Sequence, residues 1–140
     1  MWDMIVISGL LIAMLAVQDG PPEPLRFPAP RPAVECAEFL TDWRARRNCL
    51  RNLLSEAEDR LDTVADAARE EADEVDADSA GRFGARRAFD AAQTAWTGYR
   101  DAECTRRSAA MFLSEASREE ITLDCQISLT RRRADELATR

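Results

Sequence analysis

The chain has 140 residues, enough for one domain, and its 26 acidic and 19 basic side chains give a formal net charge of −7. Every basic residue is arginine, because the chain contains neither lysine nor histidine. The lack of histidine excludes the usual catalytic triads, His-containing zinc sites and imidazole pH switches. The acidic balance argues against nucleic-acid binding, and 32% charged residues are too many for a protein that crosses a membrane several times. The composition is that of a small acidic globular domain.

The amino-terminal segment has the pattern of an export signal. Residues 4–17 form an apolar run broken only by Ser8 and Gly9, which is short of the roughly 20 residues that span a bilayer. Small residues suitable for signal cleavage lie around Ala16, although Asp3 stands where a basic residue is usual. We expect residues 1–18 to be a signal peptide or an uncleaved membrane tether, with a buried core helix as the remaining alternative. The first two readings predict an exported protein, periplasmic or secreted.

A proline-rich segment follows the apolar run. Residues 20–32 contain all six prolines, each of which lacks an amide donor and disfavours helix at the residue before it. We predict that residues 19–35 are an extended linker, with a proline-rich docking motif as the alternative. No proline follows residue 32, so residues 36–140 are free to form a helical domain.

Apolar residues recur every three or four positions in three later stretches, which predicts three helices. The first runs from about Thr41, its expected N-cap, to about residue 76, with a stop at residues 78–81. The second spans about residues 82–111, and the third begins near Ser117 with a capping-box pattern and continues to the C-terminus. We expect a solvated helix end at the arginine cluster Arg131, Arg132, Arg133 and Arg140. The sequence predicts an all-α fold, a small antiparallel helical hairpin or bundle of about three helices.

The four cysteines suggest two disulfides in an exported chain, with three pairings open in principle. If the last two helices fold back near Ser114, Cys104 and Cys125 lie almost equally far from the turn and can face each other. Cys36 and Cys49 can pair only if the chain doubles back before the first helix, because 13 helical residues rise about 20 Å. A Cys49–Cys104 bond would be offset by about 10 Å, so we predict Cys36–Cys49 and Cys104–Cys125. A zinc site is disfavoured, since no two cysteines are separated by two residues.

Residues 92–104 carry the most distinctive pattern, AQ-x-AW-x-x-YRDAEC. This pattern resembles the core motif of the LprI-like lysozyme-inhibitor family of bacterial envelope proteins. Cys36 and Cys49 fall where that family has its first cysteine pair, and residues 125–137 resemble its closing C…T-x-x-R…L segment. Residues 57–62 resemble its AD-x-x-LN element, with Glu58 and Asp62 in place of the usual Asp and Asn, and a glycine-rich insertion common between the last two cysteines is missing. The resemblance covers about residues 36–137 and implies a secreted or envelope-associated binding protein.

The motif also has a direct physical interpretation. Trp96, Arg100 and Cys104 are spaced by four residues and share one helix face, and Arg100 is expected opposite position 60 of the first helix. Glu58 and Asp62 flank that position, so we predict that their carboxylates hold the guanidinium between the helices. We interpret the motif as a scaffold around a disulfide, with direct contact to a partner as the alternative. Its predicted structural residues are Gln93, Trp96, Tyr99, Arg100, Asp101, Glu58 and Asp62.

Three functions remain open from the sequence. The resemblance implies an inhibitor of lysozyme, and an acidic domain would be steered toward a basic lysozyme. Blocking a cleft that works with two carboxylates needs an arginine or a hydrogen-bonding loop, for which the turns at residues 76–84 and 110–115 are candidates. The second reading is a structural or stress-related envelope protein that binds another macromolecule or peptidoglycan. An enzyme is least favoured, because no nucleophile motif, phosphate loop or metal cluster accompanies the carboxylate pairs, and we expect no cofactor.

Overall fold

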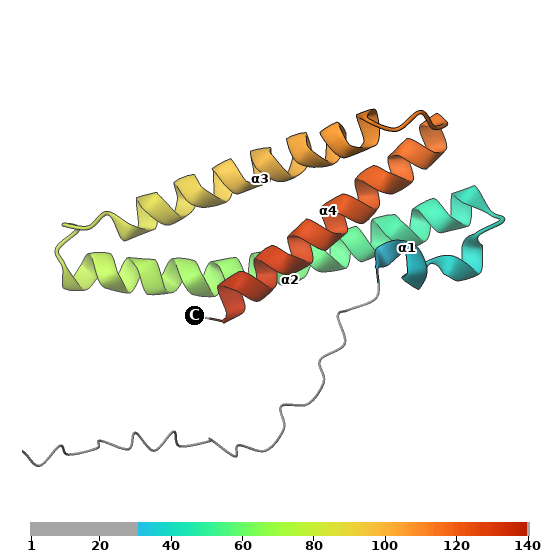
Figure 1. The fold of residues 1–140 in the computed structure, drawn as a ribbon. Helices are drawn as coiled ribbons and strands as arrows, with labels where there is room; N and C mark the ends of the chain where they lie inside the picture. The colour runs from blue at the N-terminus through green and yellow to red at the C-terminus, as the bar shows by residue number, and fades with distance from the viewer. Residues whose placement is uncertain (1–30, 140) are drawn as a thin grey trace, which may run out of the picture.

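Three long helices form the body of the molecule (Figure 1). The computed structural model describes residues 31–139, which comprise α1 (Pro32–Glu35), the 3-10 helix η1 (Ala37–Phe39), α2 (Trp43–Asp78), α3 (Ala85–Ala109) and α4 (Glu115–Ala138). None of these residues lies in a strand, and the all-α prediction is confirmed. The signal peptide or tether expected at residues 1–18, and the linker up to residue 30, lie outside the described residues.

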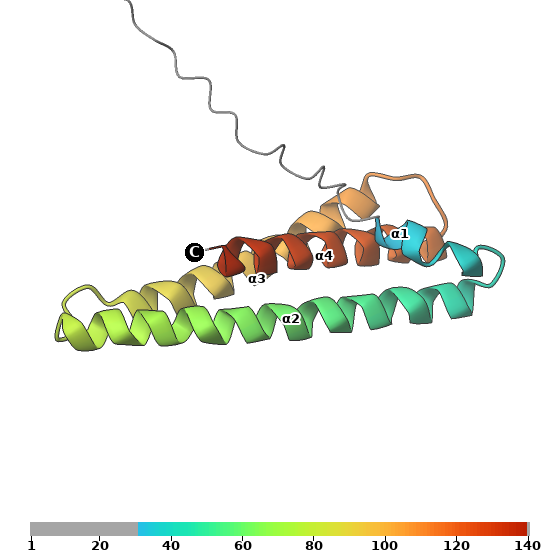
Figure 2. The same ribbon diagram turned by 90° about the horizontal axis from the view of Figure 1, so that it is seen from below.

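The three long helices are neighbours of unequal length, with α3 antiparallel to both α2 and α4 (Figure 1). α2 has 36 residues, α3 has 25 and α4 has 24, so α2 is about 54 Å long and α4 about 36 Å. α4 contacts both other helices and ends before it reaches the α2–α3 turn (Figures 1 and 2). The α2–α3 turn therefore projects beyond the three-helix core as a pair of helices.

The core combines large apolar side chains with alanine. Where the three long helices meet, Leu61, Ala65 and Ala68 of α2 are buried against Phe89 of α3 and against α4. A second cluster, nearer α1, packs Leu50 and Ala57 of α2 against α4 and Cys36; its α4 members are Leu123 and Ile127. Alanine lets helix axes approach closely but buries little apolar area, so covalent cross-links are important to this fold.

Both predicted disulfides are confirmed. Cys36 and Cys49 have Cα atoms 6.0 Å apart, and Cys104 and Cys125 have Cα atoms 5.5 Å apart. The first bond forms because α1 and η1 turn the chain back toward α2, as the spacing required. Residues 32–35, which we assigned to the linker, instead form α1, with Pro32 buried and the Ala33 N–H donating to Asp124 at 2.9 Å. The packed body thus begins a few residues before Cys36.

Several predicted helix ends were wrong by a few residues. α2 is capped by Asp42 and not by Thr41, since the Asp42 carboxylate accepts the N–H groups of Arg44 and Ala45 at 3.0 and 3.1 Å. α4 begins earlier than predicted, because Ser114 caps it by accepting the Ser117 N–H at 3.2 Å. A helix cap depends on the hydrogen bond of a single side chain, which the spacing of apolar residues does not predict.

The α2–α3 turn is closed by one carboxylate. The Asp76 oxygens accept hydrogen bonds from the N–H groups of Ala85 and Arg86, at 2.8 and 3.0 Å, where α3 begins. The bond from Ala85, followed by that from Arg86, holds the pKa of Asp76 below its ordinary value of 3.8. Three turn residues adopt left-handed backbone with positive φ, Ala80 (53°), Gly81 (73°) and Gly84 (59°), and this shortens α3 relative to its predicted start at residue 82.

Among residues 31–139, no helix combines the length and the apolar composition needed to cross a bilayer. The long helices carry charge along most of their surfaces, and most of their large apolar residues lie on the faces that meet, with Val75 and Tyr99 as exposed exceptions.

Removing the Cys104–Cys125 disulfide should lower the free energy of unfolding by about 3 kcal/mol, because the bond closes a chain segment in the unfolded state. The test is urea unfolding of Cys104→Ala/Cys125→Ala under non-reducing conditions. The matched control is Cys36→Ala/Cys49→Ala, whose separation of 13 residues against 21 predicts a slightly smaller loss. Unchanged stability in both variants would contradict a stabilising role for the cross-links.

The Asp76 clamp predicts a pH-dependent contribution to stability. Because folding lowers the pKa of Asp76, its stabilising effect is present above pH 3.8 and disappears as the pH falls through the lower folded-state value. Asp76→Asn should therefore destabilise the protein at pH 7, and its difference from the unmodified chain should shrink at pH 2.5 to 3. Urea unfolding at both pH values measures this, and an equal difference at both would show that the carboxylate charge does not matter.

Candidate functional site

The Arg100 side chain, on α3, is bonded to both other long helices. Its Nη1 donates to the Glu58 carboxylate of α2 at 3.0 Å and to the Thr130 hydroxyl of α4 at 3.2 Å, and its Nε donates to Asp101 at 2.9 Å. The guanidinium carbon lies 5.5 Å from the centre of the Trp96 ring, and only 11% of the side chain is exposed. Since Thr130 is fully buried, the cluster fixes the register of three helices in the interior.

Two further members of the motif connect α3 with α4. The Gln93 Oε1 accepts two hydrogen bonds from Arg133, from Nε at 2.9 Å and from Nη2 at 2.6 Å. The Asp101 carboxylate accepts a hydrogen bond from Gln126 at 3.3 Å in addition to the one from Arg100. Gln93 and Asp101 thus lie at contacts between the same two helices, on either side of Arg100.

Two residues of the predicted motif lie elsewhere. Tyr99 was expected beside Arg100 on the packed face, but 57% of it is exposed, because one residue along a helix is a rotation of about 100° away from that face. Asp62 was expected to hold the guanidinium together with Glu58. It lines a shallow pocket next to Arg100, but within the described part of the chain no hydrogen bond joins the two. Glu58 alone makes the carboxylate contact from α2.

Sequence reasoning missed a second buried arginine. Arg46, at the start of α2, donates to the carbonyl oxygens of Cys36 at 2.9 Å and Ala33 at 3.1 Å. It also donates to the Glu120 carboxylate of α4 at 2.5 Å, and this hydrogen bond raises the pKa of Arg46. Thr130 was missed as well; the only signal for it was its place in the closing segment of the family pattern.

We expected the carboxyl-terminal arginine cluster to be a solvated helix end, but its members are not uniformly solvated. Arg131 pairs with Glu35 of the segment before Cys36, and that hydrogen bond raises the pKa of Arg131. Arg133 is mostly buried against Gln93, Arg132 is exposed, and Arg140 lies outside the described residues. These arginines lie along the middle and end of α4, where α1, α2 and α3 are close enough to supply partners.

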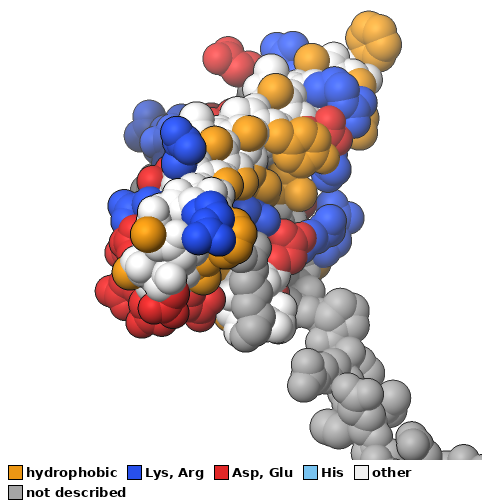
Figure 3. Space-filling model, turned by 90° about the vertical axis from the view of Figure 1, so that its left-hand side faces the viewer, with side chains coloured by type: hydrophobic (Ala, Val, Ile, Leu, Met, Phe, Trp, Pro, Cys, Tyr) orange, Lys and Arg blue, Asp and Glu red, His pale blue; other side chains and the backbone are white. Residues whose placement is uncertain are grey.

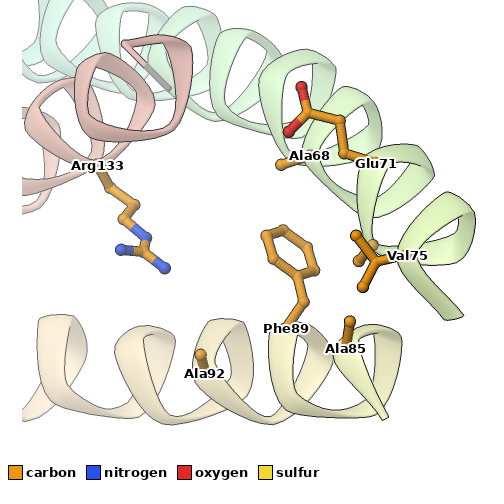
Figure 4. A pocket seen from close by; sticks show the side chains of 8 residues that line it. Ala68, Glu71, Val75, Ala85, Phe89, Ala92 and Arg133 are labelled. Atoms are coloured by element: carbon orange, nitrogen blue, oxygen red, sulfur yellow. The ribbon is translucent and has the colours of Figure 1, made fainter. Parts of the chain in front are cut away.

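A groove opens where α4 stops covering the α2–α3 pair. Figure 4 shows the Phe89 ring, from α3, and the Arg133 guanidinium, from α4, pointing into the space between the helices. The groove has a volume of about 370 Å³ and is lined by six apolar and two charged residues: Ala68, Glu71, Ala72, Val75, Ala85, Phe89, Ala92 and Arg133. We call this groove together with the α2–α3 turn the distal end.

The distal end concentrates negative charge. Figure 3 looks onto this end and shows acidic side chains gathered along its lower edge. Arg69 and Arg86 neutralise part of the charge, and the hydrogen bond from Arg86 is the main cause of a lowered pKa at Asp90. Four exposed carboxylates in the last turns of α2 have no ion-pair partner among residues 31–139: Glu70, Glu71, Glu74 and Asp78.

Among the same residues, no group of three or more potential ligands is placed to hold a metal ion. The carboxylates Glu70, Glu71, Glu119 and Glu120, noted as pairs in the sequence, lie on helix surfaces, and Glu119 and Glu120 are bonded to arginines of α2. The described residues thus form a rigid scaffold with a charged end.

Arg100→Ala should lower the free energy of unfolding by about 2–3 kcal/mol, since it removes buried stem packing and leaves the Thr130 hydroxyl without its partner. Glu58 contributes little to this loss because 44% of its side chain is exposed. Arg100→Lys keeps the charge but not the planar fork, so an intermediate loss is expected.

Urea unfolding measures these losses, and Tyr99→Ala is the matched control on the neighbouring exposed position. Its effect should stay within about 0.5 kcal/mol. If Arg100→Ala were as stable as Tyr99→Ala, the proposed role of the guanidinium in holding the helices would be refuted.

Comparison with known proteins agrees with the expectation drawn from the motif. Residues 36–137 match the model of the family described as lysozyme inhibitor LprI. No curated protein and no solved structure matches the chain. The matched region contains both disulfides and the Trp96–Arg100 cluster, so the conspicuous residues of the family are those that hold the helices together here. The chain belongs to the lysozyme inhibitor LprI family.

Proposed function

We propose that this protein is an exported, periplasmic or secreted inhibitor of a basic lysozyme, and that its α2–α3 turn enters the cleft of the enzyme. The family supports a lysozyme-inhibitor-like function, and the apolar run at residues 4–17 supports export. The observation that carries the choice of surface is a single exposed Arg-Phe pair, Arg82 and Phe83, at the apex of the acidic distal end.

The electrostatics of the distal end suit a basic partner. The exposed carboxylates of α2 create a negative field that attracts and orients a positively charged protein before contact. Such steering is strong at low ionic strength and weak when the Debye length falls below about 10 Å. The acidic residues thus accelerate the encounter, while close contacts must determine how long the complex lasts.

The close contacts would come from the apex of the turn. Phe83 is 70% exposed and can serve as an aromatic anchor in a pocket of the partner. Arg82 beside it is exposed, and a guanidinium fork matches the geometry of the two carboxylates that a lysozyme cleft uses for catalysis. Val75 and the apolar groove behind the turn extend this surface.

The turn is held in one conformation before binding. The Asp76 clamp closes it at α3, and the Gly81 N–H donates to the Asp76 carbonyl oxygen at 2.6 Å. At Gly84 the left-handed backbone and the Arg87 side chain, 3.1 Å from where a Cβ would be, favour glycine. A preorganised turn loses little conformational entropy on binding, as is typical of enzyme inhibitors.

The test is inhibition of a basic lysozyme in a cell-wall lysis assay, with the unmodified chain and Arg82→Ala/Phe83→Ser. We expect at least about a tenfold loss of inhibition in the double variant, because an anchor residue is worth about 2 kcal/mol. Phe112→Ser is the control: it removes an even more exposed phenylalanine from the turn at the opposite end and should leave inhibition unchanged.

Raising the salt concentration should slow association without abolishing inhibition. Equal loss in both phenylalanine variants would place the contact elsewhere. If the unmodified chain does not inhibit lysozyme at low or moderate salt, the alternative function remains, a structural or stress-related envelope protein that binds another macromolecule.

A further inference from the structure

The turn between α3 and α4 presents three consecutive exposed apolar residues at the end opposite the distal turn. Phe112 is fully exposed, and Met111 and Leu113 are about half exposed. The Leu113 N–H donates to the Met111 carbonyl oxygen at 2.9 Å, which places Phe112 at the apex of a three-residue turn. Apolar side chains at a convex apex cannot bury themselves within the same molecule, so they mark an interaction site.

The base of this apolar tip is rigid. The Met111 N–H donates to the carbonyl oxygen of the buried Ser108 at 3.2 Å, and Ser114 caps α4 on the other side. Below the tip, the Cys104–Cys125 disulfide joins the two helices. Phe112 is therefore exposed in a turn whose base is held by hydrogen bonds and a disulfide.

The charges around the tip differ from those of the distal end. Most carboxylates near the tip are paired: Glu103 with Arg106 and Arg107, Glu119 with Arg51, and Glu120 with Arg46. Glu115 is exposed and has no ion-pair partner among residues 31–139. The hydrogen bond from Arg106, followed by that from Arg107, lowers the pKa of Glu103 to about 2, so this pairing persists into acid. The guanidinium groups of Arg106 and Arg107 remain partly exposed beside the apolar residues.

The described part of the chain begins beside the same tip. Arg31, the first described residue, lines a groove of about 500 Å³ together with Arg106, Arg107 and Met111. Figure 1 shows α1 and the α3–α4 turn toward the same end of the molecule, opposite the α2–α3 turn. The 13 residues from 18 to 30 span at most about 47 Å, so an apolar segment at 4–17 placed in a membrane would keep this end within about that distance of the lipid.

From these observations we propose that the Met111-Phe112-Leu113 tip inserts into the interfacial region of a bilayer containing anionic lipid. The tip is convex and apolar, which fits a deformable lipid surface, and the flanking guanidinium groups lie where phosphate headgroups would meet them. The unpaired carboxylates of the distal end are repelled by the same surface and turn the molecule tip-first. This contact is independent of lysozyme binding, because it uses the other end of the molecule.

The test places a fluorescent reporter at each end of the full chain. Phe112→Trp and Phe83→Trp are compared in a parent chain that carries Trp2→Phe and Trp43→Phe. The parent retains Trp96, and its emission is subtracted from that of each variant. Vesicles contain phosphatidylcholine with or without phosphatidylglycerol, and brominated acyl chains act as quenchers. With phosphatidylglycerol present, emission from position 112 should shift to the blue and be quenched about twofold more than emission from position 83.

The two positions make the result decisive even if residues 4–17 bind the vesicle by themselves, because that binding alone does not bring position 112 into contact with acyl chains. Equal quenching at both positions would overturn the proposal. Equal quenching of position 112 with and without phosphatidylglycerol would overturn the anionic preference. A blue shift that rises with protein concentration in the absence of vesicles would identify a second copy of the chain as the partner and overturn the lipid contact.

Discussion

The guanidinium of Arg100 holds the three long helices together. From α3 it bonds to Glu58 on α2 and Thr130 on α4 while stacking on Trp96, and the Cys104–Cys125 disulfide lies one turn further along the same face. Dispersion contacts set the distance between helices but only weakly set their register. A planar group with fixed donor directions sets the register, since a slip of one residue would separate each donor from its acceptor.

The features of the fold and of the candidate site that could be predicted from the sequence are those that follow from helix geometry. The Cys104–Cys125 bond and the Arg100–Glu58 contact follow from folding an antiparallel pair about its turn, because opposite positions are fixed by their distance from that turn. Thr41 and Asp42 are equally plausible caps in sequence, and only the backbone decides between them. Arg46 was missed because buried arginine is rare and its partners, two carbonyl oxygens and a carboxylate, come from segments far apart in the chain.

The residues that identify the family are distinct from those that we propose bind a partner. Trp96, Arg100 and the cysteines maintain the frame, whereas Arg82 and Phe83 lie in a turn without a recognisable pattern. A frame that tolerates changes in its turns can present different contact residues on the same helices. The family motif therefore indicates the fold of a member. Its binding specificity depends on the residues in the turns, which the motif does not include.

The length of α2 has a consequence for where the protein can act. An uninterrupted helix of 36 residues, braced by two others and cross-linked near one end, is a stiff spacer of about 54 Å. When one end of the molecule is bound to a surface, the other end can be held at about that distance from it. This distance is comparable to the diameter of a small globular enzyme. Because of this separation, the two ends of the molecule would not compete for the same partner, and both could be bound at the same time.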